Sequence, residues 1–196
     1  MAKDIANVVG AKTRQDGFFE GNGYLITWAV GHLVGLAEPQ DYGFTSQQDM
    51  FGECKEQAYN ELPLIPDEFK LVVLENTKKQ FQIVKKLIHR DDVDMIIDCG
   101  DMGAEGHILQ WFIRVKAGCN KPVKRFCATS YTDEAILKAM NNLRPIEDFE
   151  NIIKGEYCKK KADWITGMSL SRCETLKYNT KLKQFLDNLS AAYISL

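Results

Sequence analysis

The chain has 196 residues, of which 45% are hydrophobic and 27% charged, as in a soluble globular protein with one sizeable domain or one domain plus part of another. Its formal net charge of -2 is not that of a strongly basic nucleic-acid-binding domain, so any DNA-facing surface must come from local clusters of Lys and Arg. The six cysteines form no Cys-x-x-Cys pair and have no histidine at zinc-finger spacing, which argues against a structural zinc site. We find no signal peptide and no apolar run of membrane-spanning length, and therefore expect a reduced, cytoplasmic protein that does not bind membranes.

The first 66 residues predict a helix, a hairpin and a long connection. Apolar residues on one helical face precede Gly10, which suits a helix C-terminal cap, so a helix is expected at the start of the chain. Asn22-Gly23 lies between aromatic and β-branched residues, a strong signal for a tight hairpin. Residues 38–66 are polar and rich in turn formers, and we interpret them as a surface connection.

Strands and helices alternate in the next part of the chain. Strands are predicted at residues 69–74, 93–98 and 122–129, and helices at 77–89 and 105–117 and from Thr132, a good N-cap residue. The expected buried stripes are Phe81, Val84, Leu87 and Ile88 in the first helix, and Ile108, Trp111, Phe112 and Val115 in the second. This alternation indicates an α/β fold with a mainly parallel sheet flanked by helices. A boundary is expected at about Pro145, followed by one or two helices over residues 149–172.

The stretch from Asp98 to Gly106, which reads Asp-Cys-Gly-Asp-Met-Gly-Ala-Glu-Gly, holds the candidate chemistry. It follows a predicted buried strand and precedes a helix, which places it at the carboxyl edge of the sheet, where open α/β sheets bind ligands. Clustered carboxylates there suit Mg²⁺, with Asp101 and Glu105 as ligands and Asp98 as a further one. Alternatively, Asp98 or Asp101 caps the helix and Glu105 favours its first turn electrostatically. From spacing alone, both interpretations stay open.

This stretch is similar to the Asp-x-Asp-x-Glu-Gly motif of the Toprim domain, which topoisomerases and bacterial primases share. Other segments resemble topoisomerase III, a type IA DNA topoisomerase, and occur in the same order: residues 24–33, 62–66, 77–81, 121–126, 143–145 and 163–172. The resemblance covers nearly the whole chain. It implies a Toprim-like α/β domain at residues 1–145 that lacks its first strand, and at 146–196 the incomplete start of a helical DNA-binding domain.

The departures from the family pattern weaken the expected metal site. Gly103 stands where the family has its second Asp, Ala104 where an Arg is usual, and His107 where a further Glu often follows. The resemblance also implies that a catalytic Glu precedes Met1 and that the nucleophilic Tyr follows Leu196. We therefore expect an amino-terminal topoisomerase fragment, truncated at both ends and inactive alone, with Mg²⁺ bound weakly or not at all.

Basic residues near the end of the chain are the candidates for DNA binding. A run of three lysines, residues 159–161, is more often a solvated helix face than a binding site. In the family, however, arginines at the positions of Lys159 and Lys161 lie toward DNA, and Arg172 matches another family arginine. The expected partner is single-stranded DNA, together with the remainder of a topoisomerase. We interpret Arg125 as flanking a strand and His32 as structural or exposed.

Two rival functions stay open. The first is a small Mg²⁺-dependent phosphodiesterase or primase-like enzyme that uses Asp98, Asp101 and Glu105. The second is a partner-binding or relic module without catalysis, which needs another chain to complete its sheet.

Overall fold

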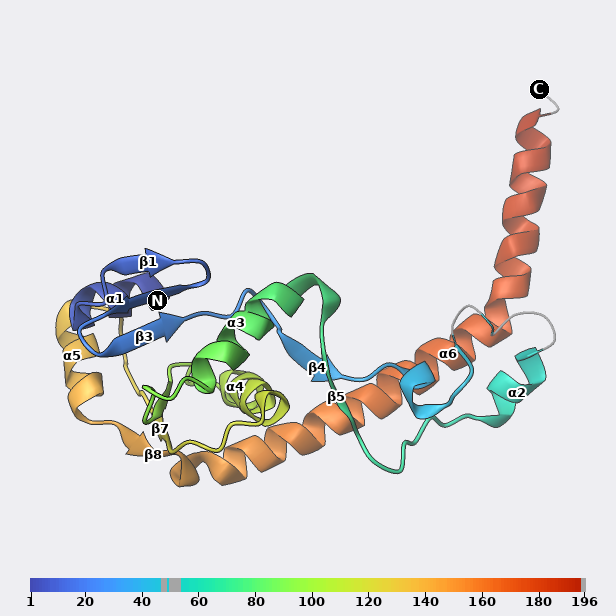
Figure 1. The fold of residues 1–196 in the computed structure, drawn as a ribbon. Helices are drawn as coiled ribbons and strands as arrows, with labels where there is room; N and C mark the ends of the chain where they lie inside the picture. The colour runs from blue at the N-terminus through green and yellow to red at the C-terminus, as the bar shows by residue number, and fades with distance from the viewer. Residues whose placement is uncertain (47–48, 50–53, 195–196) are drawn as a thin grey trace. The chain divides into compact units, whose positions relative to one another are not determined.

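The computed structural model describes residues 1–46, 49 and 54–194 and confirms the α/β class (Figure 1). The helices are α1 (Ala2–Val9), α2 (Lys55–Asn60), α3 (Lys78–Ile88), α4 (Ala104–Ala117), α5 (Asp133–Asn141) and α6 (Glu150–Ile194). The strands are β1 (Thr13–Gln15), β2 (Phe18–Gly21), β3 (Tyr24–Thr27), β4 (Val34–Leu36), β5 (Leu71–Val73), β6 (Ile96–Asp98), β7 (Val123–Arg125) and β8 (Arg144–Pro145). Short 3-10 helices are η1 (Pro39–Tyr42), η3 (Glu75–Thr77) and η4 (Ile146–Phe149).

The chain divides into two compact units that alternate along the sequence. Unit 1 comprises Met1–Gly35 and Leu71–Tyr157, and unit 2 comprises Leu36–Lys70 and Cys158–Leu196. The family-domain boundary expected at Pro145 is a separate matter and stays a prediction.

Unit 1 opens with the predicted helix and hairpin. Helix α1 ends at Gly10, whose φ of 83° places it in the left-handed region that closes helices. Strands β2 and β3 pair antiparallel through a two-residue turn in which Asn22 (φ 48°) and Gly23 (φ 75°) both have positive φ, as a tight hairpin of this kind requires. The side chain of Asn22 donates to the carbonyl of Val9 at 2.8 Å and thus ties the turn to the end of α1. Strand β1 pairs antiparallel with β2 on the other side.

The second sheet of unit 1 carries the acidic stretch, and its strand order is β6-β7-β8. Strands β6 and β7 are parallel, with Asp98 opposite Arg125, whereas β7 and β8 are antiparallel. Both pairing directions therefore occur: β6 and β7 pair parallel, as expected for a mainly parallel sheet, whereas β8 and the strands of the hairpin sheet pair antiparallel. Short turns join β1, β2 and β3 and can join only antiparallel neighbours, and Pro145 in β8, which lacks an N–H, suits an edge strand.

Two helices of unit 1 test the predicted buried faces, and α3 matches its prediction more closely than α4 does. In α3 the buried residues are Phe81, Val84, Leu87 and Ile88, as expected. In α4, Ile108 and Phe112 are buried, but Trp111 is only half-buried, Val115 is exposed, and Ile113 is buried instead.

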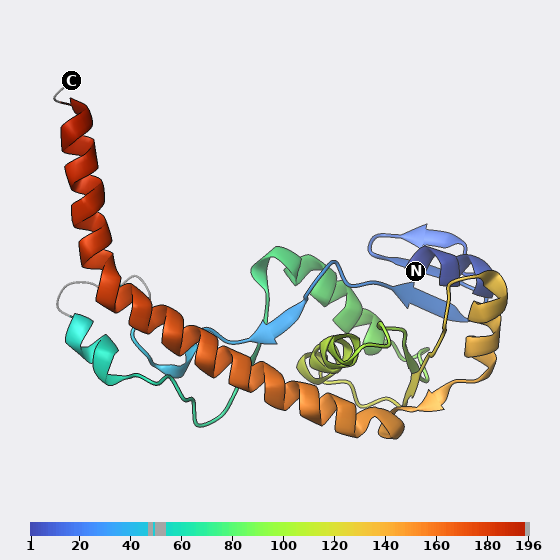
Figure 2. The same ribbon diagram turned by 180° about the vertical axis from the view of Figure 1, so that it is seen from behind.

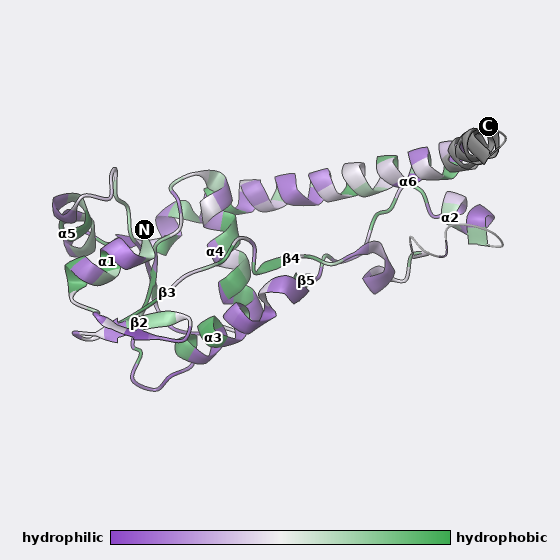
Figure 3. Ribbon diagram, turned by 90° about the horizontal axis from the view of Figure 1, so that it is seen from above, coloured by the Kyte–Doolittle hydropathy of each residue, from purple (hydrophilic) through white to green (hydrophobic). Residues whose placement is uncertain are grey.

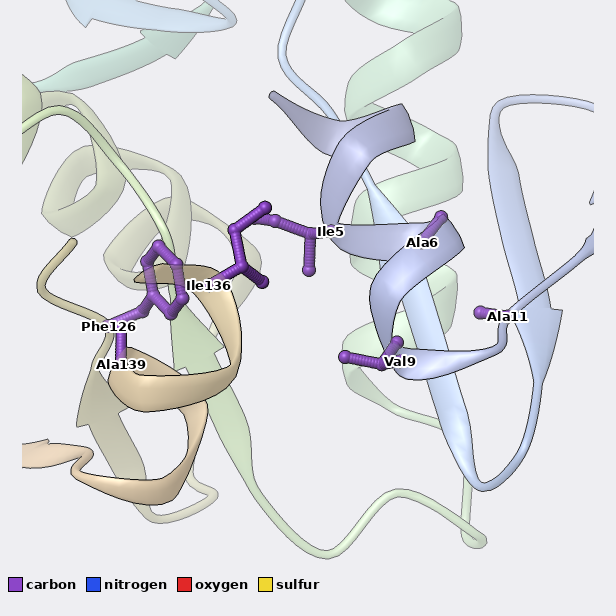
Figure 4. Packing of buried hydrophobic residues seen from close by; sticks show 7 residues of the cluster. All are labelled: Ile5, Ala6, Val9, Ala11, Phe126, Ile136 and Ala139. Carbon is purple, nitrogen blue, oxygen red and sulfur yellow. The ribbon is translucent and has the colours of Figure 1, made fainter. Parts of the chain in front are cut away.

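The core of unit 1 forms where α1 meets α5. Figure 4 shows Ile5 and Val9 of α1, Ile136 and Ala139 of α5, and Phe126 just after β7 in one cluster. Helix α5 is capped at Thr132, whose hydroxyl accepts from the backbone N–H of Ala135, as predicted.

Unit 2 is organised around Trp164 on α6. Its indole nitrogen donates to the carbonyl of Ala37 at 2.9 Å. Its ring is edge-on to the rings of Tyr42 and Phe69, with 5.5 Å between ring centroids in each pair. The segment 38–66 is more than a surface connection, because it contains η1 and α2 and buries Leu64. Residues 47–48 and 50–53 of that segment lie outside the described residues.

Helix α6 is one continuous helix, seen from behind in Figure 2, where one or two helices were expected. In the part of α6 that is coloured in Figure 3, hydrophilic and hydrophobic residues alternate along the helix. None of the helices in the described part of the chain is long and apolar enough to cross a membrane. The cytoplasmic location stays a prediction.

Candidate acidic site at the carboxyl end of β6

The acidic stretch forms a tight loop between β6 and α4. Strand β6 ends at Asp98, and α4 begins at Ala104. The loop runs directly against the first turn of α4: a Cβ added to Gly106 would lie 2.2 Å from the carbonyl oxygen of Asp101. Only glycine allows this approach, so Gly106 holds the loop close to the helix.

Asp98 lies in a buried ion pair. Its exposed fraction is 2% and that of Arg125 is 0%. The parallel register places the two residues opposite each other, and Arg125 Nη1 donates to Asp98 Oδ1 at 2.8 Å. Arg114 approaches from α4, with its Nη2 3.7 Å from Asp98 Oδ2, and burial lowers the pKa of Arg114. The carboxylate of Asp98 is thus already neutralised by protein cations.

Arg125 also fixes the path of the loop. Its Nη1 donates to the carbonyl of Asp98 at 2.9 Å and its Nη2 to the carbonyl of Asp101 at 2.6 Å. The interpretation of Arg125 as a residue that merely flanks a strand missed this role. The sequence held one signal for this ion pair: Asp98 and Arg125 lie at the ends of two strands that were predicted to be neighbours.

Asp101 and Glu105 are both exposed, unlike Asp98. His32, also exposed, has its Nε2 3.6 Å from Glu105 Oε1, a proximity that the sequence did not indicate. Burial, and secondarily the charge of Asp101, raise the pKa of Tyr131.

Among the residues that the structure describes, no three His, Cys, Asp or Glu side chains group together in a way that could hold a metal ion. The Mg²⁺ roles of Asp101, Glu105 and Asp98 stay predictions.

His107, which stands where the family often has a further Glu, is buried in unit 1. Its exposed fraction is 1%, and its ring stacks on Phe149 with 4.9 Å between centroids. Neither ring nitrogen has a hydrogen-bond partner, and burial lowers the pKa of the imidazole. A neutral histidine held in this way contributes packing rather than a ligand to the acidic loop.

A cavity of about 1210 Å³ opens beside the loop within unit 1. Its lining includes Asp98, Asp101 and Glu105 as well as Cys99. Burial raises the pKa of the Cys99 thiol to about 12, so this cysteine is protonated at neutral pH and is not a nucleophile.

The candidate DNA-binding residues lie on α6 in unit 2. Lys159 is exposed and Lys161 half-buried. Arg172 is 6% exposed, and its Nη1 lies 3.4 Å from Glu61 Oε2. Glu61 also accepts two hydrogen bonds of 2.8 Å from Thr45. Direct contact of Arg172 with DNA requires this pair to open, and the DNA-binding roles of all three residues stay predictions.

The amino-acid sequence of this chain is similar to curated proteins that share one name. No protein-family model matches it. It is similar to proteins named DNA topoisomerase 3 from Bacillus licheniformis (39% identical), Shouchella clausii (38%) and Bacillus subtilis (37%). Each similarity extends over 182 residues, which are 93% of this chain and 24% of the relative. The chain thus spans about a quarter of the length of the curated relatives it matches.

Proposed function

We infer that this chain, a topoisomerase III-like segment related to type IA DNA topoisomerases, contributes single-stranded DNA contacts and an acidic loop to that class of reaction. The observation that carries the inference is the similarity over 93% of the chain. Because the chain spans 24% of such a relative, DNA cleavage and relaxation belong to the proposal only for an assembly that supplies the remaining parts.

The acidic loop suits weak Mg²⁺ binding. Asp101 and Glu105 are exposed carboxylates at the carboxyl end of β6, whereas Asp98 is occupied by Arg125. Mg²⁺ commonly keeps several waters and binds through one or two carboxylates plus phosphate oxygens. With DNA present, the ion would supply positive charge beside a phosphate, and the loop would position it.

Gly103 offers a direct test of this site. A Cβ at Gly103 meets nothing within 4 Å, and its φ of -68° is accessible to any residue. Gly103→Asp should therefore fold normally, add a third carboxylate and bind Mg²⁺ several-fold more tightly than the wild type in calorimetry. Gly103→Asn is the matched control, because it caps α4 equally well without adding charge. Equal Mg²⁺ affinity of the Asp and Asn variants would show that Asp101 and Glu105 do not form a metal site.

DNA binding through α6 is tested by salt dependence. Lys159 and Lys161 each neutralise a backbone phosphate in the proposal, and each such contact contributes about -0.7 to the slope of log affinity against log salt for single strands. Lys159→Ala with Lys161→Ala should weaken binding of a fluorescent oligothymidylate and make the slope shallower by about 1.4. The control is Lys85→Ala with Lys86→Ala, two exposed lysines of α3. If the slope of log affinity against log salt changes equally in the α6 and the α3 double variants, the DNA-binding surface lies elsewhere.

The rival phosphodiesterase is the weaker candidate. It requires Asp98 as a metal ligand beside Asp101 and Glu105. Since the buried carboxylate of Asp98 is bonded to Arg125, such use would leave a buried guanidinium without its partner.

A further inference from the structure

Hydrogen-bond donors from separate parts of unit 2 converge on the carboxylate of Glu61. The backbone N–H of Thr45 donates to Glu61 Oε2 and the Thr45 hydroxyl donates to Oε1, both at 2.8 Å. Gln57 Nε2 donates to Oε1 at 3.2 Å, and Arg172 Nη1 donates to Oε2 at 3.4 Å. Backbone N–H, hydroxyl, amide and guanidinium groups are also the donors with which proteins hold phosphate oxygens. The donors around Glu61 therefore suit a phosphate as well as a carboxylate.

The packing of α2 on α6 holds this part of unit 2 together. Ala58 of α2 and Leu176 of α6 are both buried in one apolar cluster. The N–H of Leu64 donates to the hydroxyl of Ser169 at 2.9 Å, which ties the segment after α2 to α6. None of these contacts involves the carboxylate of Glu61. The donors on α2 and α6 thus stay close to each other when the Glu61 side chain moves, and such preorganisation favours ligand binding.

The contact between Arg172 and Glu61 is the weak one in the network. The side chain of Arg172 is 5% exposed, yet its bond of 3.4 Å is longer than the about 2.7–2.9 Å of a good charge-assisted bond. Burial lowers the pKa of Arg172, and the charge of Glu61 counteracts this effect only in part. The side chain of Glu61 is 16% exposed, so it has a route into solvent. An anion that accepts shorter bonds from the guanidinium would therefore compete with Glu61.

We propose that the donors of Thr45, Gln57 and Arg172 form a binding site for one phosphate group of a phosphodiester chain, and that the carboxylate of Glu61 closes this site in the free protein. A phosphodiester group carries one negative charge, as Glu61 does, so the exchange keeps the buried guanidinium paired. Its two free oxygens fit the same planar fork of the guanidinium that a carboxylate fits. On binding, the Glu61 side chain turns into solvent and the phosphate accepts its hydrogen bonds.

The position of Arg172 on α6 connects this site with the candidate DNA-binding residues. Lys161 and Arg172 are eleven residues apart on one helix, which corresponds to about 20° of rotation and about 16.5 Å along the axis. They therefore lie on the same face of α6. A nucleic-acid strand that follows this face from Lys161 reaches Arg172 and meets the carboxylate of Glu61 there. The identification of the chain as single-stranded DNA rests on the function proposed above, whereas the phosphate site does not.

The site can be tested with dimethyl phosphate, a phosphodiester without base or sugar. In a titration of the wild-type protein at constant ionic strength, with chloride as the balancing anion, the NMR signals of the Thr45 amide and Arg172 Nε should shift and saturate. Glu61→Gln should bind dimethyl phosphate about tenfold more tightly, because the guanidinium no longer has to leave another charged acceptor. The matched control is Glu174→Gln, which removes the same charge from an exposed position of α6 and should bind as the wild type does.

A second variant distinguishes a phosphate site from a structural clamp. Thr45→Val in the Glu61→Gln background removes the hydroxyl donor and should abolish most of the gain in affinity. A structural clamp instead predicts that Glu61→Gln lowers the free energy of unfolding of unit 2 without any gain in affinity. If Glu61→Gln does not fold, the wild-type titration still decides. Shifts that do not saturate, shifts that chloride alone reproduces, or equal affinities of the Glu61→Gln and Glu174→Gln proteins would each overturn the proposal.

The fluorescent oligothymidylate separates this proposal from the proposed DNA binding. Tighter binding of dimethyl phosphate by Glu61→Gln, with oligothymidylate binding that does not depend on Lys159 and Lys161, supports the phosphate site and contradicts the DNA surface on α6. Oligothymidylate binding that depends on both lysines, with no gain of dimethyl phosphate affinity in Glu61→Gln, supports the DNA surface and overturns the phosphate site.

Discussion

Replacing Arg125 by Met should be among the most damaging single changes to unit 1. The guanidinium is fully buried and makes three hydrogen bonds of 2.6 to 2.9 Å, to the carboxylate of Asp98 and to two backbone carbonyls. Met has a similar volume but no charge. In the variant, the buried carboxylate of Asp98 therefore keeps only Arg114 as a cationic neighbour, with Arg114 Nη2 3.7 Å from Asp98 Oδ2. Breaking a buried pair in this way costs about 3–5 kcal/mol.

Two further variants separate this effect from a general loss of packing. Arg90→Met removes two more exposed ion pairs, with Asp92 at 2.6 Å and with Glu20 at 3.1 Å, and should destabilise unit 1 far less than Arg125→Met. The double variant Arg125→Met, Asp98→Asn should lose less free energy of unfolding than the two single variants together. The reason is that it also removes the negative charge of Asp98, which has lost its main partner.

The measurement is urea-dependent hydrogen exchange of the β6 and β7 amides, which reports unit 1 separately from unit 2. If Arg125→Met lowers the free energy of unfolding no more than Arg90→Met does, the ion pair of Arg125 and Asp98 is not buried in solution. If the free energies of unfolding of the single variants simply add in the double variant, Arg125 and Asp98 do not interact. Either result refutes the reasoning.

Three other changes have defined outcomes. Gly106→Ala should destabilise the loop by about 1–3 kcal/mol, because the new Cβ meets the Asp101 carbonyl at 2.2 Å, and amide exchange in the loop should accelerate. His107→Phe should flatten the decline in stability of unit 1 as the pH falls below about 6.5. The lowered pKa in the folded state means that the unfolded state binds the proton first, so stability is retained above that pH and lost below it. Trp164→Phe should cost unit 2 about 1–3 kcal/mol in urea unfolding, because the carbonyl of Ala37 loses its buried donor.

Each of these has a matched control. Gly103→Ala adds a Cβ in open space and should leave loop exchange unchanged. Phe81→Leu alters a buried residue of α3 that does not titrate and should leave the pH dependence as in the wild type. Trp111→Phe in unit 1 should not affect unfolding of unit 2. A control that behaves like its test variant would contradict the corresponding prediction.

Local sequence signals predicted most of the secondary structure, because they act over a few residues. Asn22-Gly23 favours positive φ at two successive positions and so specifies the hairpin, and Gly10 closes α1 in the same way. The spacing of apolar residues in α3 identified its buried face completely. In α4 the same reasoning missed Ile113 and included Val115, since periodicity identifies a face but not which positions the neighbouring elements cover.

By itself, the sequence determined the α/β class, the acidic stretch between a strand and a helix, and the likeness to topoisomerase III. Only the tertiary structure decided that Asp98 is neutralised by Arg125, that Arg172 pairs with Glu61, and that β3 and β6 border one cavity. The physical reason is sequence separation. These partners lie tens to more than a hundred residues apart, so burial and charge pairing between them depend on strand register and packing, which no local pattern specifies.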